Sequence, residues 1–160
     1  MPELTQHYDF SPADRRLIAR AIKTVEKQFM AAENAPCFTS PTHILDYLRL
    51  RLWEQDREHF LVLFLNNQHK LMVAETLFSG DISSVEVSPR IIARKCLLHN
   101  SPAIVLAHNH PSGNTLPSGA DRHITDRVVQ CLNLFNIRVL DHIIIGSGNE
   151  YWSFAEHRQI

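Results

Sequence analysis

The chain has 160 residues, with 16 basic and 17 acidic side chains, and 44% of its residues are hydrophobic. This length is typical of one domain, and the ordinary hydrophobic and charged fractions exclude a disordered, collagen-like or coiled-coil protein. The near-neutral charge argues against a nucleic-acid-binding surface, which is usually basic. No apolar run approaches the roughly 20 residues that a membrane span needs, so we expect no membrane segment.

The N-terminus and the cysteines bear on the compartment. Residues 1–5 lack the basic and apolar regions of a signal peptide. The cysteines Cys37, Cys96 and Cys131 are odd in number and lack C-x-x-C spacing, so we expect reduced thiols. Because reduced cysteines are typical of cytosolic proteins, the sequence predicts a cytoplasmic location.

Helical spacing dominates the first third of the chain. The sequence SPAD at residues 11–14 has the capping pattern of a helix start, and apolar residues follow at helical spacing. Residues 32–38 interrupt this pattern, and a second helix is predicted to start at Ser40 and Pro41. We therefore assign residues 1–38 to an N-terminal helical arm and residues 39–160 to the main domain.

Apolar runs of strand length follow the two helices. They predict strands over residues 60–65, 71–78, 82–87, 103–107, 137–145 and 150–154. A helix that starts at Ser88 and another over residues 118–136 lie between them. Strands and helices that alternate around an apolar sheet predict an α/β or α+β domain of three layers.

The segment at residues 108–121, HNHPSGNTLPSGAD, joins a buried strand to a helix. Residues i and i+2 of an extended segment point the same way, so His108 and His110 can present ring nitrogens to one point. Asp121, in the first turn of the helix, can bring a carboxylate to the same point. Two nitrogen ligands and one oxygen ligand leave a fourth position of tetrahedral zinc open to water, which is typical of catalytic zinc.

Each part of this segment also has a simpler interpretation. A lone H-x-H pattern is weak evidence for a metal, and the loop after it could merely be shaped by its prolines and glycine. Ser118 and Asp121 form the S-x-x-D pattern of a helix N-cap, which needs no catalysis. The joint occurrence of these features at a strand-to-helix junction favours the metal site.

The pattern H-x-H, seven further residues and S-x-x-D resembles the motif of JAMM/JAB metalloproteases. The fuller string, HNHPSG followed by PSxxD, is similar to the RadC branch of that superfamily, with an MPN-type domain. The similarity covers roughly residues 40–157, and the N-terminal helix resembles that of short RadC-like proteins carried on prophages. The resemblance implies a cytidine-deaminase-like α-β-α sandwich with a mixed central sheet.

The resemblance also assigns roles to individual residues. His108, His110 and Asp121 match the zinc ligands of the superfamily. Ser118 matches the serine that hydrogen-bonds the bound water and the tetrahedral intermediate. The implied activity is the hydrolysis of a peptide or isopeptide bond by water activated at zinc.

An upstream glutamate completes the machinery of the superfamily, where the first helix gives way to the first central strand. Glu58 matches this place and would act as the general base. Glu75 and Glu86 are the alternatives, although they come later in the chain.

Two other functions stay open at this point: a nucleic-acid-associated protein with a link to DNA repair, and a metal-binding module without turnover. Basic side chains on the first predicted helix could contact nucleic acid, but we favour a solvated face. They are Arg15, Arg16, Arg20, Lys23 and Lys27. The sequence indicates neither the substrate nor the oligomeric state.

Asp141 and His142 stand together at the predicted last long strand. We favour a structural pair in which each satisfies the other. The alternative is a carboxylate that orients a histidine close to the metal.

Overall fold

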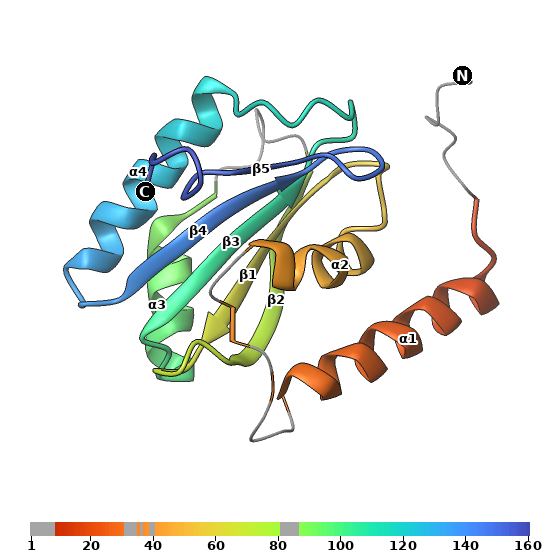
Figure 1. Ribbon diagram of the computed structural model, residues 1–160, viewed down its shortest axis with the longest axis horizontal. Helices are drawn as coiled ribbons and strands as arrows, with labels where there is room; N and C mark the ends of the chain where they lie inside the picture. The colour runs from red at the N-terminus through yellow and green to blue at the C-terminus, as the bar shows by residue number, and fades with distance from the viewer. Residues whose placement is uncertain (1–8, 31–34, 36, 39–40, 81–86) are drawn as a thin grey trace.

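The computed structural model describes residues 9–30, 35, 37–38, 41–80 and 87–160. The elements in chain order are α1 (Pro12–Met30), α2 (Pro41–Arg51), β1 (Glu58–Leu65), β2 (Leu71–Gly80), α3 (Pro89–His99), β3 (Ala103–Asn109), α4 (Gly119–Asn133), β4 (Arg138–Ile145) and β5 (Tyr151–Ser153) (Figure 1). Most of the strand predicted over 82–87 lies outside the described residues, as do Ser40 and residues 1–5. Among the described helices, none has the length and apolar character to cross a membrane.

The five strands form one mixed sheet in the order β2-β1-β3-β4-β5. Strand β1 is antiparallel to both β2 and β3, and β5 is antiparallel to β4. Strands β3 and β4 are parallel, so the chain must cross over between them, and α4 forms this crossover. The start of α4 is thereby brought close to the C-terminal end of β3.

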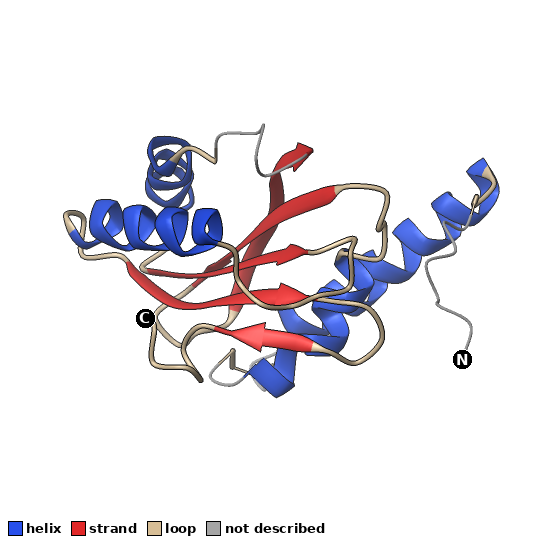
Figure 2. Cartoon of the chain, turned by 90° about the horizontal axis from the view of Figure 1, so that it is seen from above, coloured by secondary structure: helices blue, strands red, loops and turns tan. Residues whose placement is uncertain are grey.

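Helices cover both faces of the sheet. Figure 2 shows α3 and α4 on one side and α1 and α2 on the other. Alternate strand residues feed two separate cores: Leu61 and Val105 pack with α2, whereas Val62 and Leu106 pack with α3 and α4. The predicted α/β fold, a mixed sheet between two helical layers, is confirmed.

Strand β3 and helix α4 have boundaries that differ from the predicted ones. Strand β3 continues to Asn109, because His108 pairs with Phe60 of β1 and Asn109 pairs with Ile145 of β4. The strand predicted over residues 103–107 is therefore two residues too short. Helix α4 begins at Gly119 and ends at Asn133, three residues before the predicted end.

Helix α1 contacts α2 and β2, and polar pairs join it to α2 and to the loop before β1. The carboxylate of Glu26 accepts a hydrogen bond from the Tyr47 hydroxyl at 2.8 Å and lies 3.2 Å from Arg51. Arg15 forms an ion pair of 2.7 Å with Glu54, in the loop before β1. All five basic residues of α1 are exposed, as a solvated face requires. The division into residues 1–38 and 39–160 stays a prediction.

Candidate metal centre

The two histidines of the H-x-H pattern lie at the C-terminal end of β3. His108 is completely buried within the sheet, and its ring stacks on that of Phe60 with the ring centres 5.9 Å apart. His110 follows the last residue of the strand, and its backbone N–H donates to the carbonyl oxygen of Ile145 at 2.9 Å. This bond holds the backbone of His110 against β4. The backbone of both histidines is therefore held in place by pairing within the sheet.

The third side chain, Asp121, comes from the first turn of α4. Ser118 is the N-cap of this helix, and its hydroxyl oxygen accepts from the backbone N–H of Asp121 at 3.1 Å. The Asp121 carboxylate in return accepts from the Ser118 N–H at 2.7 Å and from the Ser118 hydroxyl at 2.8 Å. This capping box aims the carboxylate back past the start of the helix, towards the end of β3.

The loop between these two elements is pinned at its base. Gly113 has a positive φ of 82°, and its backbone N–H donates to the His110 carbonyl oxygen at 2.9 Å. Its carbonyl oxygen passes so close to Gly146 that a Cβ there would lie 2.6 Å from it. Any larger residue at position 146 would push the loop, and His110 with it, away from β4.

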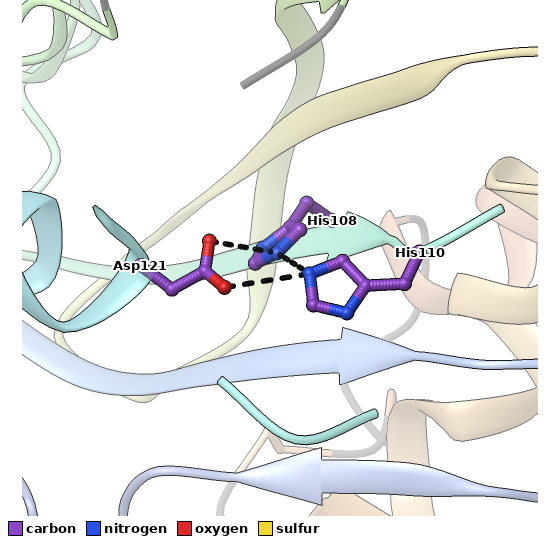
Figure 3. Close-up of side chains that lie close together, drawn as sticks. All are labelled: His108, His110 and Asp121. Atoms are coloured by element: carbon purple, nitrogen blue, oxygen red, sulfur yellow. Dashed lines mark hydrogen bonds and ion pairs between the residues drawn. The ribbon is translucent and has the colours of Figure 1, made fainter. Parts of the chain in front are cut away.

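The three side chains converge on one point (Figure 3). The Nε2 atoms of His108 and His110 are 2.9 Å apart. Asp121 Oδ1 lies 3.3 Å from His108 Nε2, and Asp121 Oδ2 lies 3.4 Å from His110 Nε2. His108 and Asp121 are buried, and His110 is partly exposed.

The hydrogen bonds behind His110 fix which of its nitrogens faces this point. Its Nδ1 lies 2.6 Å from the carbonyl oxygen of Asn114, which can only accept. Nδ1 therefore carries a proton. The neutral ring then has its lone pair on Nε2, which faces His108 and Asp121.

A series of hydrogen bonds through two further residues fixes which nitrogen of His108 carries its proton. The Thr125 hydroxyl donates its only proton to the Asp121 carbonyl oxygen at 2.6 Å, so it must accept from Nδ1 of His142, also at 2.6 Å. Burial keeps the pKa of His142 well below its usual value, so this ring is neutral and has a lone pair on Nε2. That lone pair accepts from Nδ1 of His108 at 2.8 Å, which leaves the lone pair of His108 on Nε2.

Two lone pairs and a carboxylate thus face one another with no hydrogen between them. Asp121 Oδ1 is buried and has no hydrogen-bond partner among the described residues. A cation has to balance this group, either as a proton or as a metal ion. The set of two imidazole nitrogens and one carboxylate oxygen is that of catalytic zinc sites, so the residues fit zinc.

The ionisation of these residues is consistent with this need. Burial acts against the charge on His110, but hydrogen bonds to Asp121 and Asn114 outweigh it and raise its pKa. Burial likewise opposes ionisation of Asp121, yet the two histidines hold the pKa of its carboxyl well below the usual range. The raised pKa favours a proton on Nε2 of His110, at the place that a metal would occupy.

The two residues predicted to catalyse flank this centre. Ser118 is bonded directly to Asp121, as described above. Glu58 is the first residue of β1 and shares a face with Phe60, the residue that stacks on His108. The negative charge of Glu58 is the smallest of the named causes that raise the pKa of His110.

The two glutamates considered as alternative general bases do not lie at the start of β1. Glu75 lies on β2 and pairs with Lys95 and His99 of α3. It is therefore occupied in an ion-pair network. Glu86 lies outside the described residues.

The role of His142 was missed from the sequence. Asp141 is satisfied as a structural residue, because it accepts from the backbone N–H of His142 and from the hydroxyl of Ser153. The alternative that Asp141 orients the His142 ring is wrong. The ring itself turns to His108 and Thr125. A polar pair at the start of an otherwise apolar strand was the available signal, but it did not say which group the ring would contact.

A second group of possible ligands lies on the other side of β1. Glu54, Asp56 and His59 have donor atoms within 4.8 Å of one another. Each carboxylate also pairs with an arginine, Glu54 with Arg15 at 2.7 Å and Asp56 with Arg57 at 3.2 Å. Because two guanidinium groups offset the two carboxylates, little negative charge remains to attract a cation. We interpret this group as an ion-pair network that ties the loop before β1 to α1.

The fold and this centre together define an α/β domain with a possible metal-binding His-His-Asp group at a strand end. Over residues 38–159 the chain matches the model of the RadC-like JAB domain. It therefore belongs to the RadC-like JAB-domain family.

The chain is also similar to proteins named UPF0758. The chain is 50% identical to the UPF0758 protein YeeS of Escherichia coli strain K12 over 147 residues. The aligned residues cover 92% of this chain and 97% of that protein. The UPF0758 protein YkfG of the same strain is 46% identical over 149 residues, 93% of this chain and 92% of that protein. A UPF0758 protein of Histophilus somni strain 2336 is 52% identical over 119 residues, which is 74% of this chain but 53% of that protein.

Proposed function

We propose that the protein is a zinc-dependent hydrolase of the JAMM type that cleaves peptide or isopeptide bonds in the cytoplasm. The observation that carries this proposal is the convergence of two histidine lone pairs and the Asp121 carboxylate on one point. His110 is partly exposed, so the centre is reachable from one side, as a catalytic site requires.

His108, His110 and Asp121 would hold the zinc. The metal would supply a Lewis acid that polarises an amide carbonyl and lowers the pKa of water to about 7. Glu58 would accept a proton from the attacking water and return it to the leaving amine. Ser118 would turn its hydroxyl proton from Asp121 to the oxygen of the substrate, where negative charge develops.

Metal analysis of the purified, zinc-loaded protein tests the first half of the proposal. We expect about one zinc ion per chain, and its loss in His110→Ala and Asp121→Ala. His123→Ala is the matched control, because His123 lies on the same helix turn as Asp121 but is exposed. A wild-type protein that stays free of metal after zinc loading would refute the proposal.

Cleavage of a library of peptides and isopeptide-linked conjugates tests the second half. We expect turnover that needs zinc and falls by about two to four orders of magnitude in Glu58→Gln. Full zinc binding with no turnover of any amide would instead indicate a binding module. A salt-dependent shift of DNA at physiological ionic strength would favour the nucleic-acid-associated function.

A further inference from the structure

Asn109 stands between the two histidines of the H-x-H pattern, and its side chain faces away from theirs. It is completely buried. Its amide oxygen accepts from the backbone N–H of His59 at 2.7 Å, and its amide nitrogen donates to the carbonyl oxygen of Arg57 at 2.9 Å. A weaker bond reaches the carbonyl oxygen of Glu54 at 3.3 Å.

These bonds enclose one residue, Glu58. The carbonyl of Arg57 and the N–H of His59 belong to the two peptide groups on either side of it. One amide side chain therefore holds both peptide planes that determine the backbone dihedrals of Glu58. Because Asn109 is itself flanked by His108 and His110, the same residue has a fixed relation to both histidines.

We propose that Asn109 is a positioning residue that sets the place of Glu58 relative to the metal centre. This inference rests on the proposed function, because it gives Glu58 a task at the metal. It adds that the central residue of H-x-H is a functional part of the site, although it touches neither metal nor substrate. An asparagine suits the task because its amide is uncharged and has both a donor and an acceptor end.

Ser101 supplies a matched control. Its hydroxyl accepts from the N–H of Leu65 at 3.0 Å and lies 2.9 Å from the Leu65 carbonyl oxygen, so it links the chain just before β3 to the end of β1. It is as buried as Asn109 but lies at the opposite end of the two strands. Ser101→Ala should therefore loosen the sheet without altering Glu58.

Backbone hydrogen exchange of the full-length, metal-free protein measures the first consequence. In Asn109→Ala we expect the amides of residues 57–60 to exchange about tenfold faster, since a buried hydrogen bond is lost. Ser101→Ala should leave these amides unchanged and affect residues near Leu65 instead. Asn109→Thr replaces the amide by one hydroxyl, which can still donate or accept a single hydrogen bond, and threonine favours the strand conformation. This variant should be intermediate and serves if the alanine variant does not fold.

The second measurement reports on the metal centre without any substrate. The visible absorption of the cobalt-loaded protein is followed against pH, and its midpoint reports proton loss at the metal. Glu58→Gln removes a negative charge near the centre, so we expect the midpoint to move to lower pH. Asn109→Ala should move it in the same direction, and should add nothing in the Glu58→Gln background. Ser101→Ala should leave the midpoint unchanged.

The outcomes separate this inference from the function on which it rests. If the protein binds no metal, both are overturned. If Glu58→Gln shifts the midpoint but Asn109→Ala and Asn109→Thr do not, Asn109 is only a structural residue and the positioning role is overturned. If neither Glu58→Gln nor Asn109→Ala shifts it while metal is bound, Glu58 does not act at the centre, and the inference again fails.

Discussion

His142 accepts a hydrogen bond from His108 at 2.8 Å across the neighbouring strands β4 and β3. A residue 34 positions further along the chain thereby determines which nitrogen of His108 faces the metal centre. The bond between Thr125 and His142 extends this control to α4, the helix that also carries Asp121.

Removal of this support should weaken metal binding while the three ligands stay in place. We expect Thr125→Val to lower zinc affinity by about 10-fold to 100-fold, because His142 then no longer has a fixed tautomer. Competition with a chromogenic chelator measures the affinity. Thr24→Val is the control, since Thr24 likewise bonds a backbone carbonyl one turn earlier, in α1 at the surface. Equal zinc affinity of the two variants would contradict the role of Thr125.

Ser118→Ala should have effects beyond the loss of stability that the removal of a helix cap causes. Loss of an N-cap serine destabilises a protein by about 1 kcal/mol, as urea unfolding would show. Ser11 provides the comparison, because it forms the same box with Asp14 at the start of α1, with a hydroxyl-to-carboxylate distance of 2.6 Å.

Both Ser118→Ala and Ser11→Ala should therefore lower the free energy of unfolding by a similar amount. Only Ser118→Ala should also lower zinc affinity and turnover, because Asp121 belongs to the proposed ligand set and Asp14 does not. A Ser118→Ala protein with unchanged zinc affinity and turnover would reduce Ser118 to a capping residue.

The stability of the metal-free protein should depend on pH through His110. Its pKa is raised in the folded state, because its bonds to Asp121 and Asn114 outweigh the opposing effect of burial. A histidine of this kind stabilises the fold below its ordinary pKa of about 6.5 and loses that contribution as pH rises through the raised value.

Urea unfolding in the presence of a chelator measures this dependence. As pH rises above about 6.5, wild-type stability should fall more steeply than that of His110→Gln, which lacks the titrating group. Zinc should reverse the trend, because the metal displaces the proton and binds more tightly as pH rises. If the stability of the wild type and that of the variant depend on pH in the same way, His110 is not protonated in the folded, metal-free protein.

The thiols should differ in reactivity. Cys96 is buried in α3, and burial raises its pKa to about 12. At about pH 8 this thiol is protonated and shielded, so iodoacetamide should not modify it in the folded protein. Cys131 of α4 is partly exposed and should react. Peptide mass spectrometry with and without urea distinguishes them, and early labelling of Cys96 would show that the packing of α3 is looser than described.

The parts of the site that sequence patterns predicted are local ones. His108 and His110 are two residues apart on one extended segment, and Ser118 and Asp121 are three apart on one helical turn. Spacing alone determines where such side chains point. Glu58 was different, because only the resemblance to a family singled it out from other glutamates.

The support of the site could not be predicted in this way. His142 reaches His108 only because β3 and β4 are parallel neighbours, with a register shift between Ile104 and Val105. Asn109 reaches the loop before β1 only because β1 lies on the other side of β3. Strand order and register depend on how the whole sheet packs, and no short motif contains that information.

One path of contacts starts and ends on the same residue. It leads from the Asp121 carboxylate to Nε2 of His108, 3.3 Å away, and then by hydrogen bonds through His142 and Thr125 to the main-chain carbonyl of Asp121. In such a closed circuit, a change at any member alters the contacts of two others, so substitutions should not add. Anyone who grafts the three ligands onto another scaffold would consequently transfer an incomplete part. The smallest transferable unit includes His142 and Thr125 as well.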